Sequence, residues 1–397
     1  MKGSLSIFKH GRLVVPRAGL TGRVRHALGV APVTALLGPR QCGKTTLARQ
    51  VAAGKRATYL DLENPRDLAL LEQPMVALER MRGLVVLDEI QRKPDLFGIL
   101  LVLADRRLQP ARFLVLGSAS PSLIRHTSES LAGRVRFVEM GGFTLAEVGC
   151  GKSETLWVRG GMPRSFLAGS GADSIGWRES FMATFLERDI PQMELRIPAV
   201  TLRRFWTMLA HYHGQIWNAS QIAGSMGVSH VTARHYLDIL TGAYMVRQLQ
   251  PWFLNEGKRL VKSPKVYVRD SGIFHALLNL TSIGDMERHP KLGASWEGFV
   301  MEQILAETGE RDAYFWATYS GAELDLLLAR RGRRWGFEFK YADAPVMTKS
   351  LHSAIEDLKM DHIWVVYPGK RDYELGKRVT AIGLEGLAGA IRKISGR

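Results

Sequence analysis

One eight-residue segment, GPRQCGKT at residues 38–45, constrains the fold of this chain more than any other feature. It has the pattern G-x-x-x-x-G-K-T of a phosphate-binding loop, in which backbone N–H groups at the start of a helix surround phosphate oxygens. That geometry needs a strand before the loop and a helix after it. The apolar residues 33–37 suit a short buried strand, and residues 46–51 suit the first turns of a helix. The sequence therefore predicts a nucleotide site between them.

Each residue of such a loop has an expected role. Lys44 would extend to the β- and γ-phosphates, and the Thr45 hydroxyl would bind Mg²⁺, so we expect a nucleoside triphosphate and Mg²⁺ as cofactors. The residues predicted to bind the nucleotide are Gly38, Pro39, Arg40, Gln41, Cys42, Gly43, Lys44, Thr45 and Thr46.

An acidic pair, Asp88-Glu89, follows the apolar residues 84–87. Such a run predicts a buried parallel strand, and ligands of parallel sheets bind beyond the carboxyl ends of the strands. Asp88 would hold the Mg²⁺ shell together with Thr45, and Glu89 would orient or deprotonate the attacking water. The second carboxylate favours hydrolysis over binding alone.

Two further strands are expected in this part of the chain. Residues 57–61 lie between the two motifs and fit a doubly wound sheet with alternating helices. Residues 111–116 form another apolar run, and Ser118 follows it. Ser118 would either hydrogen-bond the γ-phosphate or the attacking water, or cap a helix within its Ser-Ala-Ser-Pro turn.

Arg134 is placed by the sequence beyond the last core strand. An arginine there can stabilise the developing charge on a phosphate, in its own subunit or in a neighbour's. Arg136 competes for the same role, and a surface position is the alternative for Arg134. Action across an interface would require an oligomer.

Length and charge limit what else the chain does. Its 397 residues suit about two to four domains, and a formal net charge of +16 favours an anionic partner, with nucleic acid as the first candidate. No apolar run reaches the length of a membrane span, and the N-terminus lacks a signal-peptide pattern. Cys42 and Cys150 are expected to be reduced thiols. We therefore expect a cytoplasmic protein without membrane contact.

Residues 219–229 follow a helix-turn-helix pattern in which Gly227 allows the turn and Ser229 caps the second helix. The second helix, residues 230–240, is expected to bury Val231 together with later apolar positions. Strands at 244–249 and 265–268 would form a wing. The unit either places its second helix in a DNA major groove or packs against another part of the protein or a neighbouring subunit. The candidate DNA contacts are His230, Thr232, Arg234 and His235.

The C-terminal third contains a separate group of charged residues. Glu338 and Lys340 are two positions apart on a predicted strand and therefore project from the same face. Asp325 is expected on the adjoining strand, and Glu297 on a helix that approaches it. An acid, a second acid and an acid-x-lysine pair can bind a divalent metal and align water for phosphodiester cleavage.

The chain resembles a family of prokaryotic AAA-like ATPases whose members pair the ATPase with a C-terminal domain of unknown function. The resemblance covers roughly residues 20 to 370 and implies ATP as the nucleotide. Cys42 stands where the family often has a small aliphatic residue. A comparable Leu-Glu-Arg-Asp-Ile segment includes Arg188, which either contacts nucleotide or forms an ion pair. The resemblance rests on the sequences GPRQCGKTTL, YLDLENP, LDEIQ, GSAS, LAGR and GGMP.

The C-terminal group resembles the restriction-endonuclease-like fold. Glu297, Asp325, Glu338 and Lys340 match its four functional positions, although Leu324 stands where a proline is common. The domain would cleave DNA, grip it without cleavage, or serve a structural role.

Together these features predict an α/β protein with a doubly wound P-loop core, a helical lid, a winged helix-turn-helix and a nuclease-like α/β domain. The expected boundaries are 1–150, 151–205, 206–270 and 271–397. The predicted function is ATP hydrolysis that moves or remodels duplex or branched DNA, as in junction branch migration, by a homo-oligomer such as a ring. The alternatives are a metal-dependent DNA nuclease with a regulatory ATPase, and a nucleotide-gated signalling or defence switch that binds protein partners.

Overall fold

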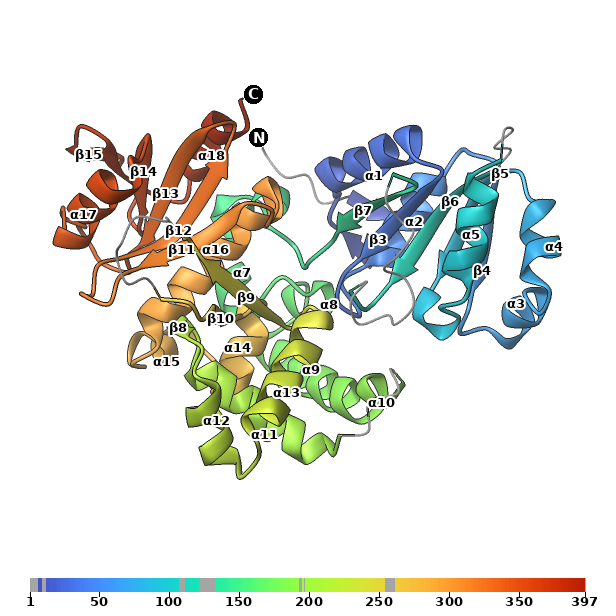
Figure 1. Ribbon diagram of the computed structural model, residues 1–397, viewed down its shortest axis with the longest axis horizontal. Helices are drawn as coiled ribbons and strands as arrows, with labels where there is room; N and C mark the ends of the chain where they lie inside the picture. The colour runs from blue at the N-terminus through green and yellow to red at the C-terminus, as the bar shows by residue number, and fades with distance from the viewer. Residues whose placement is uncertain are drawn as a thin grey trace.

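The computed structural model describes residues 6–8, 12–106, 111–120, 133–192, 195, 197–253 and 261–396. An N-terminal and a C-terminal α/β unit lie on either side of a mainly helical middle unit (Figure 1). Strands β1 (Ser6–Phe8) and β2 (Arg12–Val14) pair antiparallel before the first unit.

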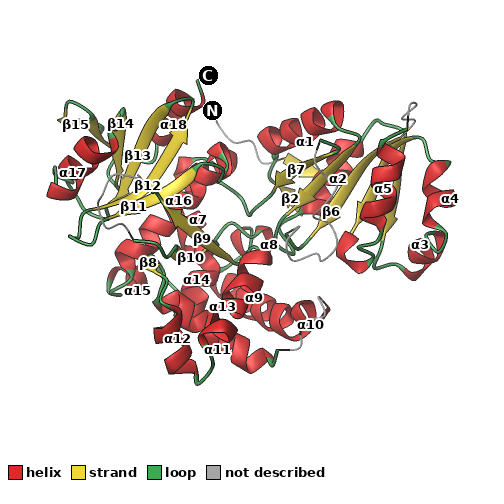
Figure 2. Ribbon diagram, viewed as in Figure 1, coloured by secondary structure: helices red, strands yellow, loops and turns green. Residues whose placement is uncertain are grey.

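A five-stranded, entirely parallel sheet forms the centre of the N-terminal unit, in the order β4-β5-β6-β3-β7. Helices cover both of its faces (Figure 2), so β3 is buried at every position. The strands are β3 (Val33–Leu37), β4 (Ala57–Asp61), β5 (Gly83–Asp88), β6 (Ala111–Gly117) and β7 (Val135–Glu139). The helices are α1 (Ala18–Val30), α2 (Lys44–Ala52), α3 (Pro65–Leu70), α4 (Pro74–Glu79), the 3-10 turn η1 (Ile90–Arg92) and α5 (Leu96–Ala104).

The middle unit is built from short helices that pack on the carboxyl side of this sheet and on one another. Its first part contains α6 (Leu145–Val148), η2 (Cys150–Lys152), α7 (Ser153–Arg159), α8 (Pro163–Phe166), α9 (Gly171–Thr184), the π-helical turn η3 (Phe185–Asp189) and α10 (Ile190–Gln192). Its second part contains α11 (Ala199–His211), α12 (Ala219–Met226), α13 (His230–Gly242), α14 (Ser271–Leu277) and α15 (Ile283–Glu287).

Helices α12 and α13 have helix-turn-helix geometry at the predicted positions. Gly227 adopts a left-handed conformation with φ of 68°, and the Ser229 hydroxyl accepts a hydrogen bond from the Thr232 N–H at the start of α13. The expected burial of Val231 is wrong, because 65% of its surface is exposed. The buried face of α13 begins at Ala233, and a residue two positions earlier on a helix lies about 200° away from it.

The second sheet contains nine strands in the order β15-β16-β14-β13-β12-β11-β9-β10-β8. The strands are β8 (Gln215–Ile216), β9 (Val246–Pro251), β10 (Lys265–Val268), β11 (Ala313–Ala317), β12 (Glu323–Arg330), β13 (Arg333–Phe339), β14 (His362–Val366), β15 (Tyr373–Gly376) and β16 (Val379–Ile382). Its helices are α16 (Leu292–Thr308), α17 (Lys349–Leu358) and α18 (Leu387–Ser395).

The two strands predicted as a wing, β9 and β10, pair antiparallel over four residues. They also belong to the C-terminal sheet, because β9 pairs in parallel with β11, with Tyr314 opposite Gln250. The two units that the sequence divides at residue 270 therefore share one sheet.

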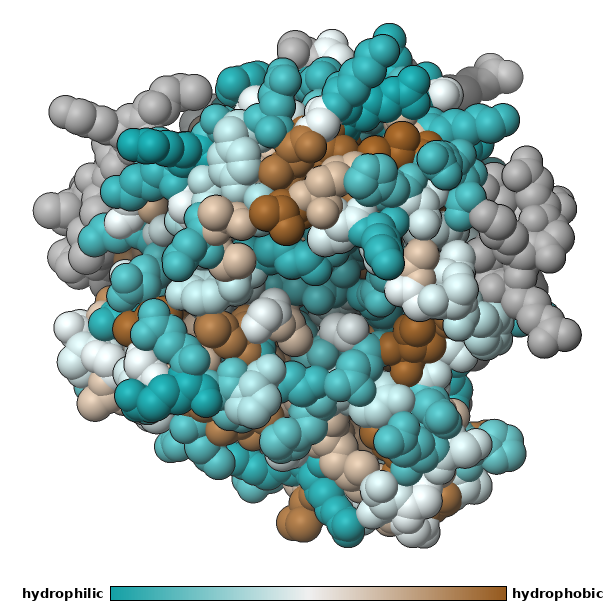
Figure 3. Space-filling view, turned by 90° about the vertical axis from the view of Figure 1, so that its left-hand side faces the viewer, coloured by the Kyte–Doolittle hydropathy of each residue, from teal (hydrophilic) through white to brown (hydrophobic). Residues whose placement is uncertain are grey.

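The surface on the C-terminal side is mainly hydrophilic, with small separate hydrophobic patches (Figure 3). Patches of this kind are ordinary on folded proteins. None of the helices in the described ranges combines the length and the apolar character that a membrane span requires.

Candidate nucleotide-binding site

The predicted phosphate loop joins the end of β3 to the start of α2, as its pattern requires. Gly43, the residue before α2, has φ of 99°, which favours glycine. Gly38 is needed for a different reason: a Cβ there would lie 1.9 Å from the backbone oxygen of Met140, just beyond β7. The loop is therefore shaped by the neighbouring strand as well as by its own sequence.

Lys44 is buried, with 5% of its surface exposed. Its Nζ donates hydrogen bonds of 2.9 Å to the backbone oxygens of Gly38 and Pro39 and to Ser118 Oγ. Ser118 Oγ also lies 3.4 Å from Glu89 Oε2. The ends of β3, β5 and β6 thus bring the lysine, the serine and the glutamate together. A contact of Ser118 with the γ-phosphate or the attacking water stays a prediction.

Asp88 and Thr45 fit the expected Mg²⁺ site. The Thr45 hydroxyl donates a 2.8 Å hydrogen bond to Asp88 Oδ2, so both oxygens can enter the shell of one cation. The Tyr59 hydroxyl also donates to Asp88 Oδ2, and burial, then Asp88 itself, raises the pKa of this phenol. Sequence reasoning missed Tyr59. Its position two residues before Asp61, which pairs with Asp88 across β4 and β5, was an available signal.

Glu89 adopts a left-handed backbone conformation with φ of 57°. Such conformations of non-glycine residues carry strain and concentrate at functional sites. Gln91 donates its side-chain N–H to Glu89 and accepts a 3.2 Å hydrogen bond from the Ser118 backbone N–H. Gln91 therefore orients the carboxylate that was predicted to activate water. The sequence pattern LDEIQ contains Gln91 but gave no role for it.

The lid segment contacts the loop through Arg40. Arg40 Nη1 lies 2.6 Å from Asp189 Oδ1, at the end of the π-helical turn η3, and π-helical turns are frequent at functional sites. Burial raises the pKa of Asp189 to about 6, against the opposing effect of Arg40. Arg188 lies beside it and forms a 3.9 Å ion pair with Glu63, the second of its two predicted alternatives.

Arg134 lies at the opposite end of the sheet from the phosphate loop. Its backbone oxygen accepts a hydrogen bond from the N–H of Val33, at the beginning of β3, and its side chain forms a 2.6 Å ion pair with Asp105. The expectation that Arg134 follows the last core strand is wrong, because Arg134 directly precedes β7. Arg136, the competing candidate, lies on β7 opposite Thr34. The structure does not bring Arg134 to the phosphate site of its own chain; a role in a neighbouring subunit stays a prediction.

The C-terminal charged residues do come together. Lys340 Nζ lies 2.7 Å from Glu338 Oε1, and Asp325 Oδ2 accepts a 3.0 Å hydrogen bond from the Phe339 N–H. Burial, then Asp325, raises the pKa of Glu297 to about 7 and that of Glu338 to about 8. Among the residues that the structure describes, no group of three or more His, Cys, Asp or Glu side chains is arranged to hold a metal ion.

Sequence reasoning missed two partners of this group, both on β10. The Tyr267 hydroxyl donates a 2.5 Å hydrogen bond to Glu297 Oε1. Lys265 Nζ lies 3.4 Å from both Glu297 Oε1 and Asp325 Oδ1. Neither residue belongs to the expected helix-strand-strand pattern.

The candidate DNA contacts lie on the outer face of α13. His230, Arg234 and His235 are exposed, whereas Thr232 is partly buried and its hydroxyl bonds to Ser229. Arg234 also forms a 3.5 Å ion pair with Asp238, one helical turn further on.

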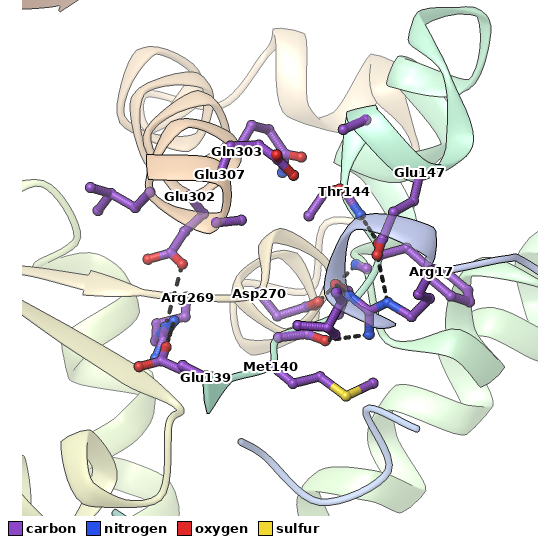
Figure 4. Close-up of a pocket in the computed structure, with 18 of the residues that line it drawn as sticks. Arg17, Glu139, Met140, Thr144, Glu147, Arg269, Asp270, Glu302, Gln303 and Glu307 are labelled. Carbon is purple, nitrogen blue, oxygen red and sulfur yellow. Dashed lines mark hydrogen bonds and ion pairs between the residues drawn. The ribbon is translucent and has the colours of Figure 1, made fainter. Parts of the chain in front are cut away.

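A cavity of about 800 Å³ lies between the three units, next to the back of the phosphate loop. Arg269, which follows β10, reaches both Glu139 at the end of β7 and Glu302 on α16, at 2.5 and 3.4 Å (Figure 4). Arg247 on β9 lies 2.5 Å from the same Glu302. On the far wall, the Arg17 side chain donates to backbone oxygens beyond β7 and to Cys42. Buried charges therefore connect the ATPase sheet with the second sheet.

The parallel sheet, the phosphate loop after β3 and the acidic pair after β5 define a P-loop ATPase of the AAA type, and residues 30–149 match the family described as "AAA domain". The chain belongs to the same family as the uncharacterized protein Rv2008c of Mycobacterium tuberculosis and the uncharacterized protein Mb2031c of Mycobacterium bovis. Each is 50% identical to it over 370 residues, which cover 93% of this chain and 84% of the relative.

The other two matches are to families described as domains of unknown function, DUF8612 at residues 151–283 and DUF4143 at residues 292–387. The prediction of an AAA-like ATPase followed by a C-terminal domain of unknown function is thus confirmed, and its nuclease-like character stays a prediction. A solved structure similar to this chain is the Walker-type ATPase PABY2304 of Pyrococcus abyssi, with a TM-score of 0.48 and 12% identity over 69% of this chain and 98% of that one.

Proposed function

We propose that the protein hydrolyses ATP and uses the energy to move along, or remodel, duplex or branched DNA. The observation that carries the hydrolysis half is the chain of contacts from Lys44 through Ser118 to Glu89, at 2.9 and 3.4 Å. These contacts join the phosphate-binding lysine to the carboxylate that would activate water, at the edge of the sheet where ligands bind.

The residues divide the work as follows. Lys44 would exchange its backbone acceptors for phosphate oxygens of the nucleotide. Thr45 and Asp88 would hold the cation, and the hydrogen bond from Tyr59 orients Asp88. Mg²⁺, when bound, supplies positive charge at the phosphate oxygens. Glu89, held by Gln91, orients or deprotonates the attacking water.

Two observations support DNA as the partner. The formal net charge of +16 favours a polyanion. The outer face of α13 exposes His230, Arg234 and His235 at the helix that would enter a major groove.

Phosphate release measured with no DNA, with duplex, with a four-way junction and with single-stranded DNA tests the proposal. We expect turnover to rise with at least one DNA form, and to fall at least about 100-fold in Lys44→Ala and Glu89→Gln. Glu89→Gln should still bind ATP, because the loop is intact. Wild-type protein that releases no phosphate would refute hydrolysis.

The DNA half has its own test. Arg234→Ala/His235→Ala should lose the stimulation by DNA, whereas the matched surface variant Arg288→Ala should keep it. A rate that no DNA form changes would contradict action on DNA and favour the nucleotide-gated switch that binds protein partners.

We also propose a homo-oligomer such as a ring, in which Arg134 would act on a neighbour's nucleotide. Light scattering with and without ATP and DNA tests this, and a monomer under every condition would contradict it.

A further inference from the structure

Lys265 places a positive charge among the C-terminal carboxylates. Its Nζ lies 3.4 Å from Glu297 Oε1 and 3.4 Å from Asp325 Oδ1, and it also contacts the Glu323 carboxylate. The side chain is buried, and its Nζ lies 5.6 Å from the centre of the Phe315 ring. A single ammonium group therefore interacts with three carboxylates from α16 and β12. We call Glu297, Glu323, Asp325 and Glu338 the acidic centre.

We propose that the Lys265 ammonium stands in the acidic centre where a related metal-dependent nuclease would hold a divalent cation. The centre then holds a cation that belongs to the chain, binds no Mg²⁺ or Mn²⁺, and does not cleave phosphodiesters. Its role is to fasten β10, a strand of the helix-turn-helix unit, to the C-terminal fold.

The distances to the surrounding oxygens distinguish an ammonium group from a divalent metal ion. Mg²⁺ needs oxygen ligands at about 2.1 Å in an octahedron, and carboxylates that share it converge closely. Here Lys265 Nζ lies 3.4 Å from Glu297 Oε1 and from Asp325 Oδ1, distances that suit an ammonium group and are too long for oxygen ligands of a divalent cation at that point. Among the described residues, no group of three or more His, Cys, Asp or Glu side chains is arranged to hold a metal ion.

Glu338 has one carboxylate oxygen for which the acidic centre supplies no hydrogen-bond donor. It is 5% exposed, its Oε1 pairs with Lys340 at 2.7 Å, and its Oε2 is buried without a hydrogen-bond partner in the structure. A buried carboxylate oxygen with no donor is costly. Lys265 makes no hydrogen bond with this oxygen.

The origin of Lys265 gives the arrangement its structural role. β10 pairs with β9 and β8, the strands that adjoin the helices α11 to α13. The ion pairs from Lys265, and the 2.5 Å hydrogen bond from Tyr267 to Glu297, tie this strand to α16 and β12. Buried pairs of this kind are strongly destabilising to break on one side only.

The test uses the full chain without nucleotide and follows Mn²⁺ binding by calorimetry and by the shift of the thermal unfolding midpoint. Lys262, an exposed lysine three residues before Lys265, supplies the matched variant Lys262→Met. We expect that neither wild type nor Lys262→Met shows Mn²⁺ binding that depends on Asp325. Lys265→Met leaves an unneutralised acidic pocket, so it should gain about one bound Mn²⁺, and Lys265→Met/Asp325→Asn should lose it again. Wild type that binds Mn²⁺ in an Asp325-dependent way would overturn the proposal.

Two further measurements cover a Lys265→Met protein that does not fold. In the wild-type background, Asp325→Asn should lower the unfolding midpoint, because it removes a partner of Lys265 and the acceptor of the Phe339 N–H. If Asp325→Asn raises the midpoint, Asp325 is held against the repulsion of its neighbouring carboxylates as in a metal site, and the proposal fails. Labelled duplex, junction and single-stranded DNA incubated with Mn²⁺ should remain intact; cutting by wild type that Asp325→Asn abolishes would also refute it.

Discussion

Replacing Arg269 with methionine removes the cation that joins the ATPase sheet to the second sheet while keeping most of the apolar part of the side chain. Arg269 is 15% exposed and pairs with Glu139 and Glu302, whose side chains are 35% and 14% exposed. Breaking a fully buried pair on one side costs about 3–5 kcal/mol. Glu302 keeps Arg247, and water reaches part of Glu139, so we expect about 2–3 kcal/mol.

Urea unfolding followed by tryptophan fluorescence measures this loss. Arg288→Met is the matched control: Arg288 pairs with Asp285 but is 77% exposed, so its loss should stay within about 0.5 kcal/mol. A double-mutant cycle with Glu139→Gln should give a coupling of about 1–2 kcal/mol. An Arg269→Met protein as stable as the control, or an additive cycle, would refute the idea that these charges connect the two sheets.

The same pair predicts a dependence on pH. Burial alone would raise the pKa of Glu139, but Arg269 and Arg247 lower it below its ordinary 4.5. A carboxyl with a lowered pKa in the folded state contributes stability above its unfolded pKa and loses it as pH falls through the folded value. The difference between wild type and Arg269→Met should therefore be largest near neutral pH and shrink below about pH 4.5. A difference that stays constant from neutral pH to well below pH 4.5 would contradict this.

Three other changes probe the nucleotide site. Tyr59→Phe should raise the Mg²⁺ concentration for half-maximal phosphate release several-fold, since Asp88 loses a hydrogen bond; an unchanged Mg²⁺ titration would exclude this role. The pKa of Asp189 is raised from 3.8 to about 6, so lowering the pH from 7.5 to 5 should stabilise wild type relative to Asp189→Asn. Urea unfolding measures this, and an equal change of stability with pH in both proteins would contradict the shift. Gly38→Ala should destabilise the fold by at least about 2 kcal/mol, because its Cβ would lie 1.9 Å from a backbone oxygen, whereas Gly19→Ala, with no atom within 4 Å, should not; equal unfolding midpoints would refute the clash.

Local patterns predicted the strand–loop–helix framework of the candidate nucleotide site. The strand, loop and helix around Lys44 occur where the motif placed them, because each depends on residues close together in the sequence. The same holds for the turn at Gly227, whose left-handed conformation and adjoining cap are local requirements.

Contacts between distant residues were not predictable in this way. Lys265 contacts Asp325, which lies 60 positions further along the sequence. The spacing of the carboxylates in the sequence does not predict this contact. Arg134 was misplaced because β7 was not foreseen: its sequence, VRFVE, has two exposed positions at its centre and lacks the continuous apolar run of β3. Which end of the sheet a residue next to an edge strand occupies depends on how that strand pairs, and the local sequence does not show this pairing.

The backbone ladder between β9 and β11 has a consequence for how this molecule comes apart. Since parallel hydrogen bonds there cross from one unit to the other, neither half can melt without exposing an open sheet edge of its neighbour. Gentle protease treatment should therefore not separate the helix-turn-helix segment from the C-terminal α/β unit as two stable fragments. A shortened protein that ends at residue 270 would lose β11, the strand that pairs with β9. The backbone edge of β9 would then be exposed, and the shortened protein would be prone to aggregate through it.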